Sequence, residues 1–338
     1  MISSTTTARV YRIEKLGGLE GLVSGFTPIP TAGPGEVLVR VRASSLNYRD
    51  IIILDGNYFL PVPAGRIPLS DAAGEIVAIG PDVTRFSPGD RVTNSFIPEW
   101  LDGPYTGKGS SYSADTDGWL TDYRVVQAEA LIPIPDDLGF EEAATLPCAG
   151  VTAWSALKGV LPSDTVLTQG SGGVSLFAIQ LARAMGARVI ATTSSDKKIE
   201  QIKALGADEI INYKTQPEWS QRVRELTAGK GADRIIEVGG PGTFEQSVKA
   251  IAIGGQVSMV GALACMQGGV EFMAMFLSQA RYQPIVVGSR QDLEDLLQCV
   301  TQHAIRPCID STWDFDDAKL GFERLAGRNV FGKVVVKY

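Results

Sequence analysis

The pattern of hydrophobic and polar positions divides this chain into two parts that meet near Phe140. In residues 9–135, short runs of strand-forming residues, such as 37–41 and 74–79, are separated by turns rich in glycine and proline. Short runs with this punctuation are typical of antiparallel strands. The first part is therefore predicted to be a barrel-like β domain.

After Phe140 the pattern changes to apolar runs that alternate with amphipathic helical segments. Strands are expected near 165–169, 188–193, 209–212, 233–238, 256–261 and 284–288, with helices near 174–185, 196–205, 218–228, 243–252 and 271–281 between them. Strands separated by crossover helices predict an α/β fold with a doubly wound parallel sheet. Helices near 292–301 and 316–326 and a last strand at 333–337 complete the chain, and we expect that strand to return to the first domain.

One long segment, residues 98–118, follows neither pattern and is rich in glycine, serine and tyrosine. A loop of this length in a compact domain is functional or mobile. Most of the aromatic residues in and beside it are expected to pack in the core or the loop, but they could also form one wall of a pocket for a flat conjugated substrate. They are Trp100, Tyr105, Tyr112 and Trp119.

Composition narrows the class of protein. A chain of 338 residues with 44% hydrophobic residues is long enough to build two cores. Its net charge of -7 works against a nucleic acid or an anionic membrane as partner. The sequence has no signal-like segment and no apolar run of membrane-spanning length, so we expect a cytoplasmic protein. The four cysteines lack CxxC spacing and are expected to be reduced, mostly buried thiols: Cys148, Cys265, Cys299 and Cys308.

A glycine turn at 170–173 joins the strand expected at 165–169 to the next helix. In a dinucleotide-binding βαβ unit the first glycine makes the turn, and Gly172 lets the backbone approach a pyrophosphate at the helix N-terminus. Ser175 occupies the third glycine position and is small enough for close packing of helix and strand. The residues expected to contact the pyrophosphate are Gly172, Gly173 and Val174, with Ser175 as a further candidate.

The second strand of this unit, at 188–193, ends without an acidic residue. An Asp or Glu about 20 residues after the glycines normally binds the free ribose 2′-hydroxyl of NAD. Here the strand end carries hydroxyl side chains and is followed by Lys197 and Lys198. Hydroxyls and a lysine suit a 2′-phosphate, so we predict NADPH as the cofactor, with Ser194 and Lys198 at its 2′-phosphate.

Several motifs in a fixed order resemble the medium-chain dehydrogenase/reductase superfamily over nearly the whole chain. They are Ala-Ser-Ser-Leu-Asn-Tyr-Arg-Asp at 43–50, Asp-Ala-Ala-Gly at 71–74, Gly-Asp-Arg-Val at 89–92, Leu-Pro-Cys-Ala-Gly-Val-Thr-Ala-Trp at 146–154, and the glycine turn. The resemblance implies a GroES-like catalytic domain made of residues 1–150 and 291–338. It also implies a Rossmann dinucleotide-binding domain at 151–290.

Zinc alcohol dehydrogenases of that superfamily hold a catalytic zinc through Cys, His and Cys. By resemblance these three positions fall on Asn47, Ser70 and Cys148, of which only the cysteine binds zinc well. The relatives' structural zinc needs four cysteines near 94–118, where this chain has none, and the sole histidine, His303, has no Cys or acidic residue at metal-binding spacing. We therefore expect no metal.

Without zinc, the resemblance points to the branch that contains quinone oxidoreductases and enoyl reductases. These enzymes send hydride from NADPH to a quinone or to the β-carbon of an α,β-unsaturated carbonyl, and the product anion then needs hydrogen-bond donors and a proton. Tyr58 is the candidate donor, although it could simply pack on a barrel loop, because an ordinary phenol near pKa 10 is a poor acid at neutral pH. Asn47 could hold the nicotinamide or a substrate oxygen, or could be a turn residue. Tyr48 and Asp50 are weaker candidates, and Asp50 is better explained as a structural hydrogen-bond acceptor.

Further cofactor residues follow from the resemblance. It places Thr152 at the nicotinamide ribose or phosphate, Tyr213 beside the adenosine phosphate, and Asn329 at NADPH, where a simple β-turn asparagine is the alternative. Gly261 ends a strand on the carboxyl edge of the sheet, where such folds bind ligands. Of the two adjacent lysines, which point about 100° apart on a helix, the resemblance favours Lys198.

Two other functions remain open at this point. An alcohol dehydrogenase or carbonyl reductase of the same superfamily is disfavoured by the absent zinc ligands, and a non-catalytic NADPH-binding sensor would leave NADPH unoxidised by quinones and enones. We also expect a homodimer, because the strand near 285–288 would lie at a sheet edge that should be paired or covered.

Overall fold

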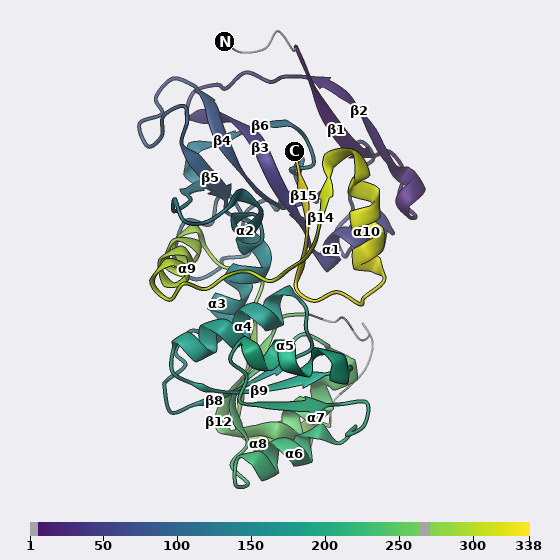
Figure 1. The fold of residues 1–338 in the computed structure, drawn as a ribbon, viewed down its shortest axis with the longest axis vertical. Helices are drawn as coiled ribbons and strands as arrows, with labels where there is room; N and C mark the ends of the chain where they lie inside the picture. Colours follow the sequence, from purple (N-terminus) through teal and green to yellow (C-terminus); the bar gives the residue numbers. More distant parts are fainter. Residues whose placement is uncertain (1–5, 262, 264–268, 270) are drawn as a thin grey trace. The chain divides into compact units, whose positions relative to one another are not determined.

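The computed structural model describes residues 6–261, 263, 269 and 271–338 (Figure 1). Cys265 lies outside the described residues. The chain forms two compact units. Residues 1–151 with 288–338 make the first, which we call the β unit, and residues 152–287 make the second, which we call the α/β unit. Along the described ranges, no helix is both long enough and apolar enough to span a membrane.

The β unit is built on a seven-stranded sheet of order β14-β15-β3-β4-β5-β7, with β6 also paired to β3. These strands are β3 (Glu36–Leu46), β4 (Asp71–Ile79), β5 (Arg91–Asn94), β6 (Tyr123–Gln127), β7 (Leu131–Pro133), β14 (Ile309–Asp314) and β15 (Lys333–Lys337). A separate antiparallel pair consists of β1 (Thr7–Ile13) and β2 (Leu22–Pro28). The helices are α1 (Tyr48–Leu54), α2 (Phe140–Ala143), α9 (Arg290–Gln302) and α10 (Ala318–Ala326), with a π-helical turn, η3 (Leu146–Gly150).

The C-terminal strand of the chain joins this sheet beside a strand from the N-terminal half. β15 pairs antiparallel with β3, so that Val334 faces Leu46, and Figure 1 shows the yellow tail beside the purple strand. Gly332 leads into β15 with a φ of +96°, and a Cβ there would lie 2.1 Å from the carbonyl oxygen of Cys308. A glycine is needed at this turn, and it delivers Lys333 next to the end of β3.

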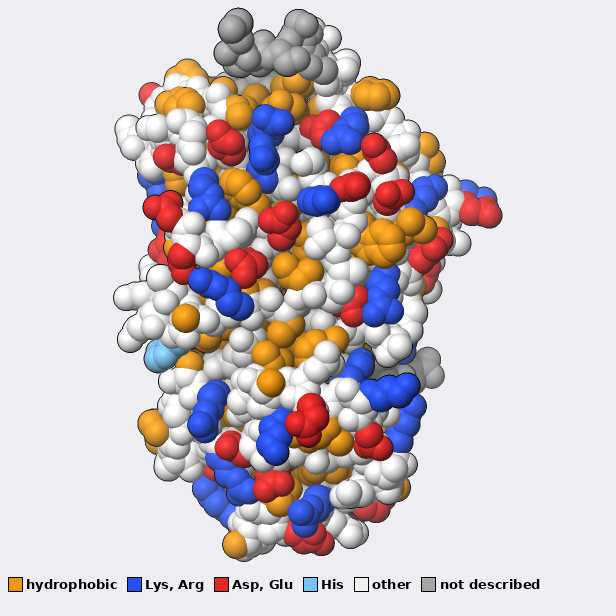
Figure 2. All heavy atoms as spheres, in the orientation of Figure 1, with side chains coloured by type: hydrophobic (Ala, Val, Ile, Leu, Met, Phe, Trp, Pro, Cys, Tyr) orange, Lys and Arg blue, Asp and Glu red, His pale blue; other side chains and the backbone are white. Residues whose placement is uncertain are grey.

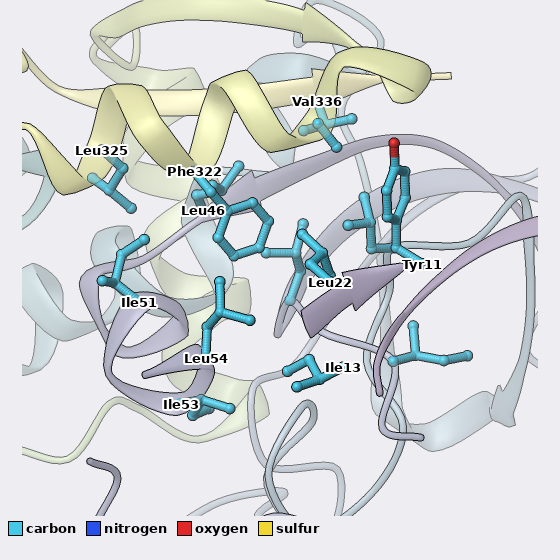
Figure 3. Close-up of a cluster of buried hydrophobic side chains, with 14 of the residues drawn as sticks. Tyr11, Ile13, Leu22, Leu46, Ile51, Ile53, Leu54, Phe322, Leu325 and Val336 are labelled. Atoms are coloured by element: carbon cyan, nitrogen blue, oxygen red, sulfur yellow. The ribbon is translucent and has the colours of Figure 1, made fainter. Parts of the chain in front are cut away.

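One hydrophobic cluster holds α1 and α10 against the strands of the β unit (Figure 3). Phe322 of α10 and Leu46 of β3 are both buried in it. Burying a side chain of this size contributes about 1.5–3 kcal/mol. Its labelled members are Tyr11, Ile13, Leu22, Leu46, Ile51, Ile53, Leu54, Phe322, Leu325 and Val336. The cluster therefore fixes the position of α1, and the candidate site lies at the start of this helix.

The α/β unit contains a parallel sheet of order β10-β9-β8-β11-β12-β13, and its mixed α/β architecture confirms the predicted fold class. The strands are β8 (Thr165–Gln169), β9 (Arg188–Thr193), β10 (Glu209–Asn212), β11 (Ala232–Glu237), β12 (Ile251–Met259) and β13 (Arg281–Pro284). The helices are α3 (Val151–Leu157), α4 (Gly173–Ala184), α5 (Ile199–Ala204), α6 (Trp219–Leu226), α7 (Pro241–Ala250) and α8 (Phe272–Ser278). The chain order reverses between β8 and β11, and such a switch point is where sheets of this kind bind ligands.

Two strand positions differ from the sequence prediction. β12 begins at Ile251, directly after α7, whereas the pattern placed its start at 256. Gly254 has a φ of +75°, and the pairing with β11 shifts register between Ala232 and Arg234, so this strand is interrupted just before the predicted start. β13 is Arg281–Pro284 rather than 284–288.

Candidate functional site

The three positions assigned to zinc ligands by resemblance lie together in the β unit, around the carboxylate of Asp71. Asn47 precedes α1, Ser70 precedes β4, and Cys148 belongs to η3. One carboxylate oxygen of Asp71 accepts from Asn47 Nδ2 at 2.9 Å and from Cys148 N at 3.2 Å. The other accepts from Ser70 Oγ at 2.6 Å. Sequence reasoning assembled these three residues but missed the acid that joins them, although it directly follows Ser70.

Lys333 brings a positive charge to the same cluster. Its side chain is buried, with 3% of the residue exposed, and its ammonium donates to Asn47 Oδ1 at 2.6 Å and to the carbonyl oxygen of Leu46 at 2.5 Å. The Asn47 amide is thus bonded at both ends, to Lys333 through its oxygen and to Asp71 through its nitrogen. An amide held in this way serves to order the cluster.

The residues of this cluster do not fit a zinc ion. An amide and a hydroxyl are poor zinc ligands, and both are engaged in hydrogen bonds. Cys148 alone of the three residues carries a good zinc ligand, and catalytic zinc sites use about three protein ligands. Elsewhere in the described ranges, no group of three or more His, Cys, Asp or Glu residues is arranged to hold a metal ion. His303 is exposed at the end of α9.

Asp50 is a buried carboxylate beside this cluster. One of its oxygens accepts from the backbone N–H of Asn47 at 2.8 Å, which is the structural role expected from the sequence. Its other oxygen has no hydrogen-bond partner among the described residues. Burial raises the pKa of Asp50 to about 6, and the charge of nearby Arg49 opposes that rise.

Tyr58, the predicted proton donor, lies beside the guanidinium of Arg49. Arg49 Nη2 donates to the phenol oxygen at 3.3 Å, and the guanidinium carbon lies 5.1 Å from the centroid of the Tyr58 ring and 4.9 Å from that of Phe96. Arg49 Nη1 also donates to the carbonyl oxygen of Tyr112 at 3.0 Å. Because the phenol oxygen accepts from Arg49, its own proton is directed elsewhere.

The four aromatic residues of the long loop fall into two pairs. Tyr112 and Trp119 are buried in a core cluster of the β unit, with their ring centroids 5.4 Å apart. Trp100 and Tyr105 pack together with centroids 5.0 Å apart, and Tyr105 is exposed. The first pair therefore belongs to the core, and only the second remains available for the predicted pocket wall.

In the α/β unit, the glycine turn and the start of α4 leave open space for a ligand. Gly172 precedes α4, and no heavy atom lies within 4 Å of the place that its Cβ would occupy. A twelve-residue helix presents unpaired N–H groups at this end. The Ser175 hydroxyl donates to the carbonyl oxygen of Gln169 at 2.6 Å, so this serine ties α4 to β8.

The lysine favoured by the resemblance reaches the glycine turn. Lys198 Nζ donates to Ser171 Oγ at 3.0 Å, whereas Lys197 is exposed. Tyr213 lies near the end of β9, where its backbone N–H donates to the carbonyl oxygen of Thr193 at 3.0 Å. Sequence reasoning passed over Asp196, whose carboxylate accepts from Asn212 Nδ2 at 2.7 Å. This acid lies three residues past the end of β9.

The remaining predicted cofactor residues are divided between the units. Thr152 is buried in the α/β unit, and Gly261 follows β12. Asn329 is exposed in the β unit, on the turn between α10 and β15, and its carbonyl oxygen accepts from Arg324 Nη2 at 3.0 Å. The neighbouring Arg328 donates to the hydroxyl of Tyr48. Thr152 and Gly261 thus belong to the α/β unit, and Asn329 belongs to the β unit.

Comparison with known proteins places this geometry in a family. A family model described as an alcohol dehydrogenase GroES-like domain matches residues 33–136, and one described as a zinc-binding dehydrogenase matches residues 173–302. A zinc-type alcohol dehydrogenase-like protein of Schizosaccharomyces pombe is 42% identical and covers 96% of this chain and 97% of its own length. A chloroplastic quinone oxidoreductase of Triphysaria versicolor is 30% identical and covers 95% of each chain. The crystal structure of a putative alcohol dehydrogenase from Sinorhizobium meliloti superposes with a TM-score of 0.93 at 38% identity, covering 99% of this chain and 100% of that one.

Proposed function

The chain belongs to the medium-chain dehydrogenase/reductase superfamily of oxidoreductases, and on that premise we propose that it transfers hydride from NADPH to a quinone or an α,β-unsaturated carbonyl without zinc. The observation that carries this proposal is the cluster around Asp71. Asn47, Ser70 and Cys148 direct their polar groups to that carboxylate, and Lys333 supplies a cation. These residues do not suit a zinc ion, and without such a Lewis acid the alkoxide formed in alcohol oxidation loses one strong source of stabilisation.

The α/β unit is suited to bind a nicotinamide dinucleotide, and Lys198 of this unit favours NADPH as that dinucleotide. When bound, NADPH supplies the hydride from C4 of its nicotinamide. The open turn at Gly172 and the N-terminus of α4 suit the pyrophosphate, as expected for this superfamily. Ser194 and Lys198 would hold the 2′-phosphate, with Tyr213 beside it. Asp196 is an acid close to this position in the sequence, and its bond to Asn212 holds its carboxylate beside β10.

The proton that completes the reduction is assigned to Tyr58. Hydride addition leaves negative charge on a carbonyl-derived oxygen, and a positioned O–H donor near that oxygen stabilises the charge and can pass on its proton. Arg49 holds the phenol oxygen from one side, so the hydroxyl proton is free to point away toward a substrate. Asn47 is then a residue that orders the site, since both ends of its amide are already bonded.

The test compares oxidation of NADPH and of NADH with a quinone, an enone and a simple aldehyde, before and after treatment with a zinc chelator. We expect NADPH oxidation with the quinone or the enone, unchanged by the chelator. A second candidate, an alcohol or carbonyl oxidoreductase, is favoured by the names of two of the relatives. Aldehyde reduction lost with the chelator, or one tightly bound zinc per chain, would establish that candidate instead.

We also propose that the chain forms a homodimer through the edge of its parallel sheet. β13 is the last strand of that sheet and, within the described part of the chain, pairs with β12 alone. The neighbouring α8 exposes large apolar side chains, including Phe272 (74%) and Leu277 (65%), and such a stripe needs a covering surface. Light scattering after size exclusion should give twice the chain mass, and a monomeric mass contradicts the dimer.

We propose that the partners do not include nucleic acid. The net charge is -7, and Figure 2 shows Lys and Arg side chains interspersed with Asp and Glu on the face in view. A phosphate backbone is bound through clustered positive charge. Retention on a nucleic-acid column at physiological salt would contradict this proposal.

A further inference from the structure

Glu237, the last residue of β11, is a buried acid that the proposed chemistry does not use. It is 1% exposed, and among the described residues no Lys, Arg or His pairs with it. Its carboxylate instead accepts hydrogen bonds from Gly239 N (2.9 Å), Gly240 N (3.0 Å), Thr243 Oγ1 (2.5 Å), Gln169 Nε2 (2.8 Å) and the Ser247 hydroxyl. These hydrogen bonds compensate for the burial of the carboxylate.

These donors come from different parts of the carboxyl edge of the sheet. Gln169 ends β8 and immediately precedes the glycine turn, while Thr243 and Ser247 lie on α7. The backbone oxygen of Glu237 also accepts from the N–H of Val260 at 2.8 Å, just past the end of β12. One residue therefore joins the ends of β8, β11 and β12 and the first turns of α7.

The loop after β11 is shaped around this carboxylate. A Cβ at Gly239 would lie 2.2 Å from Thr243 Oγ1, so only glycine allows the hydroxyl and the two backbone N–H groups to converge on one oxygen. Gln169 completes the arrangement, because its side-chain oxygen accepts from the N–H of Val238 at 3.3 Å. The carboxylate thus fixes both the loop 238–240 and the residue before the glycine turn.

We propose that Glu237 is a positioning residue for the nicotinamide dinucleotide. It holds the loop 238–240 and, through Gln169, the glycine turn in the conformation that receives the cofactor. A negative charge near a phosphate-binding edge would repel the ligand, so its benefit must come from the order that its donors impose. This role rests on dinucleotide binding by the α/β unit but not on the choice of NADPH, of substrate or of Tyr58.

The test measures dissociation constants of NADPH and NADH for the full chain and for Glu237→Gln. The amide would direct its NH₂ at groups that are themselves donors, and a buried donor without an acceptor weakens the ordered state. We expect the dissociation constants of both cofactors to rise about tenfold or more. At saturating cofactor, kcat and the KM for the acceptor should stay within about twofold, because no group at the reacting atoms has changed.

Two milder variants keep the result interpretable if Glu237→Gln does not fold. Thr243→Ala and Ser247→Ala each remove one donor and should raise the same dissociation constants about threefold. Glu245→Gln is the matched control, since that acid lies on the same helix, α7, and pairs with exposed Lys249, and this variant should bind the cofactors like the wild type.

The outcomes separate this role from the proposed function. A wild-type chain that binds neither NADPH nor NADH overturns the proposed function and this role with it. If the wild type binds the cofactors and the variants melt at a lower temperature but keep the same dissociation constants, this role alone is overturned. Glu237 would then stabilise the fold without positioning the cofactor.

Discussion

The guanidinium of Arg49 donates to the phenol oxygen of Tyr58 at 3.3 Å and lies 5.1 Å from the centroid of the same ring. Phe96 covers the guanidinium as well, at 4.9 Å. A cation in this position attracts the ring face and donates to the phenol oxygen, so it holds the ring in place. Arg49 therefore fixes the Tyr58 side chain, as its proposed role as a proton donor requires.

Removing the Tyr58 hydroxyl tests its assignment as the proton donor. Tyr58→Phe keeps the ring but not the donor, and we expect kcat to fall about 100-fold, as is typical for loss of a general acid. The dissociation constant of NADPH should not change. Tyr105→Phe, on the exposed part of the long loop, is the control. A kcat within about twofold of wild type would show that Tyr58 only packs.

Arg49 should act through Tyr58, and a double-mutant cycle can show it. Arg49→Lys keeps the charge but loses the planar fork that reaches both Tyr58 and the carbonyl oxygen of Tyr112, so we expect kcat to fall about tenfold. In the Tyr58→Phe background the same change should have little further effect, because the two residues work as a unit. If the fold-reductions in kcat of the two single variants multiply in the double variant, the two residues act independently and the coupling is contradicted.

Lys198 should decide between the two cofactors. Lys198→Ala removes the ammonium proposed for the 2′-phosphate, so we expect the KM for NADPH to rise about tenfold and the KM for NADH to change little. Lys197→Ala is the matched control, because its exposed neighbouring side chain does not make the bond to Ser171. Equal losses with both cofactors would mean that Lys198 only supports the glycine turn.

Local pattern predicted much of the fold because strand and helix periodicities are properties of consecutive residues. The strand at 188–193 matches β9 at both ends. β12 was placed too late, since Gly254 and Gly255 interrupt its apolar run. Lys333 could not be linked to Asn47, because their contact depends on the pairing of β15 with β3 across most of the chain. The motif resemblance supplied the three clustered positions but not their hydrogen-bond partners, Asp71 and Lys333.

Glu237 shows a second limit and a usable signal. It follows Ile235 and Ile236 at the end of β11, whose residues other than Asp233 are buried. An acid that follows buried apolar residues needs hydrogen-bond donors, so it could have been flagged from the sequence. Its donors could not have been named, because Gln169 and Ser247 are brought to it by the sheet and by α7.

Asp50 should make stability depend on pH in a defined direction. Burial raises its pKa in the folded chain to about 6, above the value of about 3.9 for an unfolded aspartate. Between these values the folded state binds a proton that the unfolded state lacks, so this group adds stability as the pH falls from about 7 to about 4.5. The melting temperature of the wild type minus that of Asp50→Asn should therefore increase as the pH falls through that range. A constant difference would contradict the raised pKa.

Lys333 should be the cation on which the buried cluster depends. Lys333→Met keeps much of the side-chain volume but leaves Asn47 Oδ1 without its donor and the Asp71 carboxylate without a nearby ammonium. Removing one partner of a buried ionic group costs about 3–5 kcal/mol of the free energy of unfolding. Lys337→Met is the matched control, since that lysine lies on the same strand and pairs with exposed Asp314. Denaturant unfolding of the two variants measures the difference, and an equal, small loss in both would show that Lys333 does not support the cluster.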